Sequence, residues 1–199
     1  VSRLRDAGCR DFFVAQWGEA AAIADLVPPQ WISVLNGIDD RDITPGLQSG
    51  AIPVLNTPKQ IAMWKAAGGG RCHVMFDSGI NRLGIGPEQL SPDLLEGLDI
   101  NIFMSHLASA DEDSGQNLSQ LALFREQANM LKANRLSLAN SAGIMLGPDY
   151  HFDLTRPGIG LYGGRPYEFS ARVVGLSLPV IQTRDVAPEE TVGYAASWE

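Results

Sequence analysis

The feature that most constrains the fold is a regular alternation of short apolar segments with helical segments or connections of helix length. Each apolar segment has the length of a strand, and several of the following stretches carry apolar residues at helical spacing. This alternation is typical of a parallel α/β sheet, and strands this short favour a barrel over an open sheet. The strands are expected at residues 11–16, 31–38, 52–56, 72–79, 100–107, 136–142 and 152–158.

The segments between these strands carry local helix signals. Thr57 and Pro58 predict the N-cap and the first residue of a helix. The glycine run 68–70 follows that helix and precedes a strand, which indicates a helix C-terminus rather than a phosphate loop. Residues 42–51 predict a turn-rich connection. A later helix is predicted to present one apolar face, formed by Leu118, Leu121, Phe124, Ala128 and Leu131.

Composition limits the class of protein. The chain has 199 residues, of which 45% are hydrophobic, enough for one large core or for one domain and part of another. A net charge of −8 argues against nucleic-acid binding, and no apolar run approaches the roughly 20 residues of a membrane span. Cys9 and Cys72 form no CxxC pair, so we expect free thiols, a cytoplasmic protein and no metal site. Because the chain starts at Val1, we expect it to be a fragment.

The pattern changes after Gly164. Alternating β-branched residues, Pro179 and Pro188 replace the helical spacing, which indicates the opening strands of an all-β domain. We therefore expect an incomplete βα barrel over residues 1–167, and the first strands of a C-terminal β domain over residues 168–199.

Polar side chains follow several of the predicted strands. Active sites of βα barrels lie at the C-terminal ends of the strands. Asp77 with Arg82, His106, Ser141 and Arg156 all fall at such ends, so they are expected to face one mouth. The plain alternatives are an N-cap serine, a surface salt bridge for Arg156 and a hydrogen-bonded core-edge histidine.

The segment RPGIG, which starts at Arg156, has the chemistry of an anion cradle. Its proline fixes φ, and its glycines allow the backbone to approach a ligand closely. The Ser141 hydroxyl and the amides of Gly158 and Ile159 are expected to converge on a phosphate. Further along, Tyr194 lies among glycine and small residues, which suggests a reacting phenol; the alternative is ordinary packing.

Five motifs together resemble alanine racemase, a fold-type III pyridoxal-phosphate enzyme. They are MFDSGINRLGI, FMSHLASAD, LANSAG, RPGIGLYGG and VGYAASW. The resemblance implies an eight-stranded TIM-type (β/α)8 barrel, incomplete here at its N-terminus, followed by a β domain in a homodimer. It also implies pyridoxal 5'-phosphate as cofactor and the interconversion of L-alanine and D-alanine, which supplies D-alanine for peptidoglycan.

The resemblance also implies roles for individual residues. Tyr194 would remove or return the proton at the substrate Cα, reaching into the barrel of the partner subunit. His106 would lie against the cofactor ring and couple to Tyr194 and Arg156. Arg82 would hold the cofactor's phenolic oxygen and the substrate side. The phosphate would be bound by Ser141, Gly158 and Ile159.

Two positions depart from the family pattern. The family's cofactor-anchoring lysine lies in a Lys-Ala-Asn-Ala-Tyr-Gly-like motif, and Lys59, Lys65 and Lys132 have no such context. Met75 stands where many members place a carbamylated lysine that orients the arginine equivalent to Arg82. We therefore expect the 199-residue chain alone to be inactive. A broader amino-acid racemase of the same fold type, and a non-catalytic phosphate-ligand-binding or assembly domain, remain the alternatives.

Overall fold

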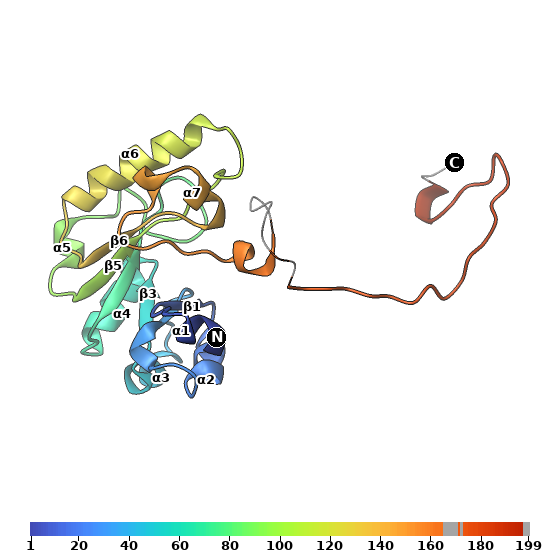
Figure 1. Ribbon diagram of the computed structural model, residues 1–199. Coiled ribbons are helices and arrows are strands. Elements are labelled where there is room, and N and C mark those ends of the chain that lie inside the picture. The colour runs from blue at the N-terminus through green and yellow to red at the C-terminus, as the bar shows by residue number, and fades with distance from the viewer. Residues whose placement is uncertain (165–170, 172, 197–199) are drawn as a thin grey trace.

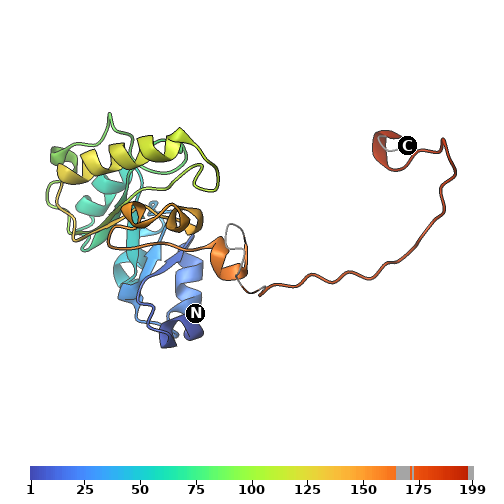
Figure 2. The same ribbon diagram turned by 45° about the horizontal axis from the view of Figure 1, so that its top comes forward.

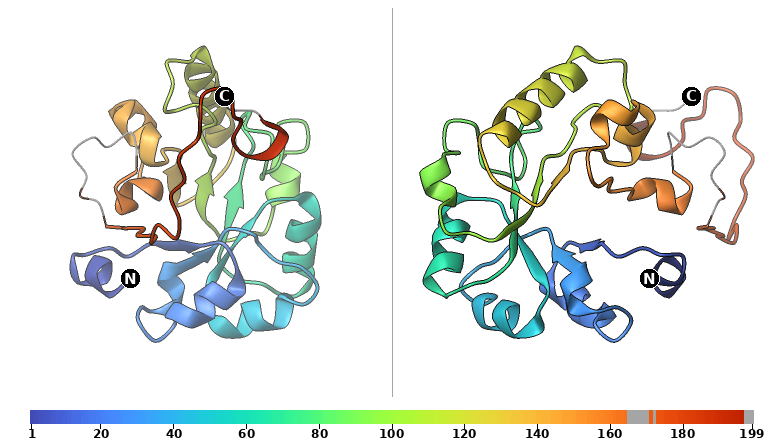
Figure 3. Two further views of the ribbon diagram at one scale, coloured as in Figure 1. Left: turned by 90° about the vertical axis from the view of Figure 1, so that its right-hand side faces the viewer. Right: turned by 60° about the vertical axis from the view of Figure 1, so that its left-hand side comes forward.

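The computed structural model describes residues 1–164, 171 and 173–196. In this part of the chain, six strands form one parallel sheet in sequence order, β1 to β6. The sheet curls into half a barrel with the helices on its outer side (Figures 1 and 3). The predicted incomplete TIM-type barrel is therefore confirmed.

Each strand is shorter than its predicted span, because the ladder ends where the chain turns into the connecting loops. The strands are β1 (Phe12–Val14), β2 (Ile32–Val34), β3 (Ile52–Leu55), β4 (Cys72–Met75), β5 (Ile100–Met104) and β6 (Arg135–Ser137). The α-helices are α1 (Ser2–Asp6), α2 (Trp17–Ile23), α3 (Ile43–Ser49), α4 (Pro58–Ala66), α5 (Pro92–Leu95), α6 (Gly115–Asn129) and α7 (Ser141–Met145). The 3₁₀ turns are η1 (Pro29–Trp31), η2 (Pro148–Tyr150), η3 (Ile159–Tyr162) and η4 (Tyr194–Ala196).

Two predicted connections differ from the structure. Residues 42–51 contain helix α3. Its Pro45 is compatible with a helix because it falls in the first turn, where a missing N–H breaks no helical hydrogen bond. Residues 152–158 form no strand; they make an isolated bridge between Asn140 and Arg156. Phe152, with φ 50°, lies in the left-handed region, which interrupts an extended chain.

The apolar face predicted for α6 is only partly correct. Leu121 and Phe124 are buried, but Leu118 is 67% exposed. The buried face instead includes Asn117, Gln120 and Gln127, polar residues that lie at helical spacing with Phe124. Buried amides need hydrogen-bond partners, and loop groups near the barrel mouth supply them to Gln120 and to Asn117 Nδ2.

The sheet carries a separate apolar cluster on each face. The larger cluster joins the outer face to the helices and contains Trp64, Phe103 and Phe124. The inner face is filled by Val54, Met75, Ile102 and Met104. Because successive strand residues point to opposite faces, the short strands contribute to both clusters.

Polar contacts close the N-terminal end of the inner face. His73 Nδ1 accepts a hydrogen bond from Ile102 N (3.2 Å), so His73 Nε2 carries the proton and donates to Ser33 Oγ at 2.9 Å. Asp11, just before β1, makes a two-point ion pair with Arg135 at the start of β6, at 2.7 and 2.9 Å. This pair joins the two edge strands.

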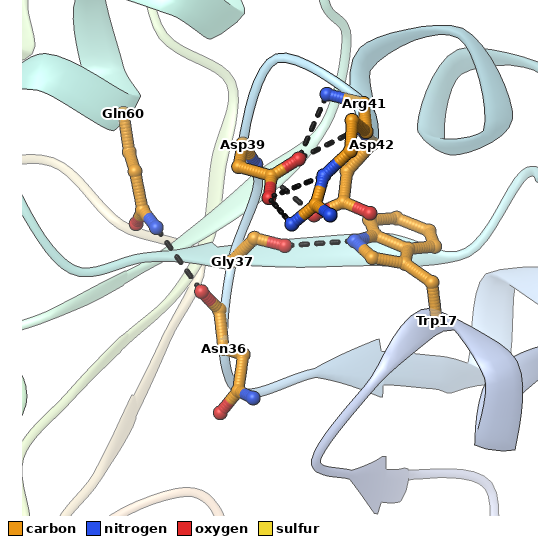
Figure 4. Close-up of polar contacts among 7 residues, drawn as sticks. All are labelled: Trp17, Asn36, Gly37, Asp39, Arg41, Asp42 and Gln60. Atoms are coloured by element: carbon orange, nitrogen blue, oxygen red, sulfur yellow. Dashed lines mark hydrogen bonds and ion pairs between the residues drawn. The ribbon is translucent and has the colours of Figure 1, made fainter.

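The loop after β2 is held from both sides (Figure 4). Trp17 Nε1 donates to Gly37 O at 2.8 Å, and Gln60 Nε2 donates to Asn36 O at 3.0 Å. In the same loop, hydrogen bonds from Arg41 lower the pKa of the Asp39 carboxyl. The loop is therefore fixed by its neighbours at the mouth of the barrel.

The described residues after 172 form an extended segment that runs away from the barrel body (Figures 1 and 2). Residues 171 and 173–196 contain no strand, and their apolar side chains are exposed. Part of the predicted β-domain segment, 168–170, 172 and 197–199, lies outside the described residues. The boundary at residue 167 therefore stays a prediction. Within the described residues, no helix is long and apolar enough to cross a membrane.

Candidate active site

Buried polar side chains gather where β4, β5 and β6 end. Ser78, Ser105, Ser137 and Ser141 are each at most 5% exposed. Their strands are parallel neighbours, so their C-terminal ends share one edge of the sheet. That edge is the predicted barrel mouth.

Arg156 is anchored across two of these strand ends. Its Nη1 donates to Ser137 Oγ, and its Nη2 donates to Ser105 O. Its backbone N donates to Ala139 O at 2.9 Å, beside the bridge to Asn140. Burial lowers the pKa of the Arg156 guanidinium to about 10, so it remains a cation at neutral pH. The mouth thus contains a fixed positive charge, and the surface salt bridge considered as the alternative does not form.

His106 follows β5 directly and is half-buried. Burial, with smaller contributions from the charges of Arg156 and Arg82, lowers the pKa of the imidazole to about 4. Its Nε2 lies 3.5 Å from Asn140 Nδ2, a long and therefore weak contact. At neutral pH, His106 is accordingly an uncharged imidazole beside two cations.

Ser141 contacts the glycine segment directly, and its expected role in phosphate binding stays a prediction. Its Oγ accepts hydrogen bonds from Gly158 N at 2.9 Å and from Gly160 N at 3.1 Å. The Ile159 amide is not part of this pair, and the Ile159 side chain is 63% exposed. The N-cap of α7 is Asn140, whose side chain accepts from Gly143 N, so the N-cap reading of Ser141 is wrong.

Asp77 shapes the turn that carries Arg82. Its Oδ1 accepts the backbone N–H groups of residues 79–81 at 2.9 to 3.1 Å. Asn81, with φ 55°, is in the left-handed region, which an asparagine tolerates better than most residues. The Arg82 side chain is exposed, yet it acts on His106 through its charge. Met75 lies in the inner apolar cluster and offers no anion to Arg82.

Tyr194 is not brought to this mouth within the chain. It lies in η4, on the extended segment, and its side chain is 99% exposed. The other two histidines occupy packing positions: His73 is on the inner face of the sheet, and His151 Nε2 donates to Ile144 O at 2.9 Å.

The acidic loop 111–113 borders an open hollow of about 420 Å³ that Leu118 and Tyr150 also line. Within the described ranges, no group of three or more His, Cys, Asp or Glu side chains is arranged to hold a metal ion. The hollow therefore carries no metal assignment.

Sequence reasoning missed Gln120, which hydrogen-bonds the backbone of His106 and of Ala108, two residues further on. Its Nε2 donates to His106 O at 3.0 Å, and its Oε1 accepts from Ala108 N at 2.9 Å. The sequence signal that could have identified Gln120 is its position, an amide among apolar residues on the face of α6 that faces the core. Ser78 and Ser105 were missed because small polar residues at strand ends are common.

The fold and the mouth together define a βα-barrel domain that presents a fixed cation, a neutral histidine and a hydroxyl–amide cradle at one end. The family model for the N-terminal domain of alanine racemase matches residues 1–166. The catabolic alanine racemase of Agrobacterium fabrum is 42% identical over 211 residues, 98% of this chain and 54% of the relative. The alanine racemase of Rhodospirillum rubrum is 43% identical over 213 residues, 99% of this chain and 57% of the relative.

Solved structures agree with the sequence relatives. The alanine racemase from Bartonella henselae with covalently bound pyridoxal phosphate has a TM-score of 0.77 and 35% identity, over 85% of this chain and 54% of that chain. The biosynthetic alanine racemase from Pseudomonas aeruginosa has a TM-score of 0.77 and 31% identity, over 98% of this chain and 59% of that chain. The chain belongs to the alanine racemase family. It spans somewhat more than half the length of these curated relatives.

Proposed function

We propose that the whole protein is an isomerase that interconverts L-alanine and D-alanine with pyridoxal 5'-phosphate as cofactor. The observation that carries this proposal is the gathering of Arg156, His106 and the Ser141 hydroxyl at one end of the barrel. The names of the curated relatives support it, and so does the cofactor in the Bartonella henselae structure.

The glycine segment fits the phosphate group of such a cofactor. The Ser141 hydroxyl accepts hydrogen bonds from two backbone amides, so its own proton remains available to donate to a phosphate oxygen. A Cβ built on Gly158 would meet nothing within 4 Å, so the backbone there is open to a ligand. We assign phosphate binding to the Ser141 hydroxyl and to the amides of Gly158 and Ile159; the Gly158 amide, which donates to Ser141 Oγ in this structure, would exchange that partner for a phosphate oxygen.

Arg156 is suited to the ring nitrogen of the cofactor. When bound, pyridoxal phosphate supplies an electron-withdrawing ring that makes the substrate Cα–H more acidic. Arginine can only donate hydrogen bonds, so it would leave that nitrogen unprotonated and the ring a weaker electron sink. This should favour return of the proton to Cα over transamination. We expect Arg156→Glu to raise the share of transamination, and an unchanged share would contradict this role.

Proton transfer at Cα requires a base on each face of the substrate. We assign one base to the Tyr194 phenol. Its position on a segment remote from its own mouth supports transfer into the barrel of a second copy, and hence a homodimer. His106 would lie against the ring, and Arg82 would hold the phenolic oxygen. The anchoring lysine is the expected second base, and no lysine of these 199 residues has the family's context.

The cellular setting follows from the same proposal. Cys9 and Cys72 are free thiols, which supports a reducing compartment, and we propose the cytoplasm. There the product D-alanine would supply peptidoglycan synthesis. The amino-acid substrate is small and polar, and no nucleic-acid or membrane partner is proposed.

The test uses the full-length protein loaded with pyridoxal phosphate. L-alanine should be converted to a racemic mixture, followed by circular dichroism and by a D-amino-acid oxidase assay. Ser141→Ala should weaken cofactor binding, whereas His151→Gln, away from the mouth, should not. Equal turnover of a panel of amino acids would favour a broader racemase. Cofactor binding with no isomerisation would favour the non-catalytic alternative and overturn the proposal.

A further inference from the structure

Gln120 is the most connected buried amide near the mouth. It is 1% exposed, and its Nε2 donates both to Ser78 Oγ and to His106 O, each at 3.0 Å. Its Oε1 accepts from Ala108 N at 2.9 Å. A buried amide is unfavourable unless it is hydrogen-bonded, so this geometry strongly restricts the loop that carries His106.

The contacts of Gln120 extend to the cation of the site. Ser78 Oγ lies 2.7 Å from Ser105 Oγ, and the carbonyl of Ser105 accepts a hydrogen bond from Arg156. One helix side chain therefore joins the end of β4, the end of β5 and the backbone of His106. The arrangement fixes the backbone that carries the imidazole relative to the carbonyl that holds the guanidinium, without touching either group.

A second buried amide on the same helix, away from the mouth, provides a comparison. Gln127 lies two turns further along the same face of α6 and is 7% exposed. It borders a small hollow with Leu90, Leu95 and Leu131, at the end of the helix away from the Gln120 contacts. Both residues contribute buried amides to α6, but only Gln120 contacts the mouth.

We propose that Gln120 is a positioning residue that holds His106 and, through Ser78 and Ser105, Arg156 in the geometry that the reaction needs. The inference rests on the proposed function, because it takes His106 and Arg156 as the groups that meet the cofactor. Its physical content, the fixing of the His106 backbone, can be measured in the protein without cofactor.

The experiment compares Gln120→Met with Gln127→Met in the full-length protein. Methionine keeps the length of the side chain and removes both hydrogen-bonding ends. In Gln120→Met, the freed loop should admit water, and the pKa of His106 should rise by about one unit from about 4. The pKa is read from an NMR titration of the imidazole signals without cofactor, with His106→Gln to assign the resonance.

The kinetic readout separates positioning from substrate binding. We expect Gln120→Met to lower kcat about 10- to 100-fold, because a small misplacement of reacting groups is costly, while KM for alanine changes little. Gln127→Met should leave both kcat and the pKa of His106 at wild-type values, even if both variants melt at lower temperature.

Each outcome decides the inference. An unchanged pKa and kcat in Gln120→Met would refute it, and so would equal losses in Gln127→Met, which would indicate a general effect of the helix. If Gln120→Met does not fold, Ser78→Ala removes one of the three partners and should raise the pKa by a smaller amount; no rise would refute the inference. If the wild-type protein binds the cofactor but does not racemise alanine, the proposed function fails, while the pKa comparison still tests the positioning of His106.

Discussion

Replacing His73 with asparagine should make the fold less sensitive to acid. His73 is buried on the inner face of the sheet, and burial, with Arg135 as the next cause, lowers its pKa to about 3. In the unfolded chain the imidazole pKa is close to 6.5. Below pH 6.5 the unfolded state therefore binds one more proton than the folded state, and the free energy of unfolding falls as the pH falls.

The size of the effect follows from the two pKa values. Stability is complete above pH 6.5 and is lost at about 1.4 kcal/mol per pH unit down to about pH 3. At pH 5, His73 thus costs about 2 kcal/mol. His106, whose pKa is lowered to about 4, adds a similar loss, so the wild type loses about 4 kcal/mol through the two histidines.

The assay is urea unfolding at several pH values between 7.5 and 5 for the wild type and His73→Asn. Asparagine offers Oδ1 to Ile102 N, but it is smaller than the buried imidazole, so the variant should be less stable at pH 7.5. Because asparagine does not titrate, the variant should lose only about 2 kcal/mol of unfolding free energy on going from pH 7.5 to pH 5. The carboxylates titrate in both proteins and cancel in the difference. Parallel plots of unfolding free energy against pH would refute the reasoning.

Three further changes test separate parts of the structure. Gly37→Ala should lower the unfolding free energy by more than about 1 kcal/mol, because φ is +72° and the new Cβ would lie within 2.6 Å of two oxygen atoms. The measurement is urea unfolding. Gly68→Ala is the control for the effect of φ alone, because Gly68 has φ +66° but open space around the new Cβ. Phe124→Ala removes a fully buried ring whose centroid lies 5.4 Å from that of Phe103, on which it stacks. The change should lower the unfolding free energy by about 3–5 kcal/mol, again measured by urea unfolding. Ser141→Ala should weaken pyridoxal phosphate binding by the full-length protein about tenfold in an absorbance titration, whereas exposed Ser119→Ala should not.

The sequence was most informative where local chemistry acts alone. Thr57 accepts from Gln60 N and Pro58 starts α4, as their capping preferences predict. Six of the seven strands that the apolar alternation predicts are present, and the residues that follow them include those at the mouth. The segment at Phe152 failed because its backbone turns into the left-handed region where the ring packs on Phe124, a tertiary contact that strand propensity does not contain.

The site was predictable to a similar degree. Ser141 follows β6 after a short turn, and Arg156 bridges to Asn140 beside it, so the expected strand order placed both near one edge. Gln120 lies on a helix, and its role depends on which loops its amide reaches, which spacing does not reveal. The exposure of Leu118 has the same origin, because the faces of α6 are set by the polar contacts of the mouth as well as by apolar burial.

The ion pair between Asp11 and Arg135 has a consequence for synthesis of the chain. The two residues are separated by 124 positions, yet they bond side to side at the base of the half-barrel. On a ribosome that adds about 5–20 residues per second, roughly 6–25 s pass between the synthesis of Asp11 and that of Arg135. During that time β1 can pair with β2 but lacks the contact that ties it to β6, so this link between the two edge strands is among the last that folding can form.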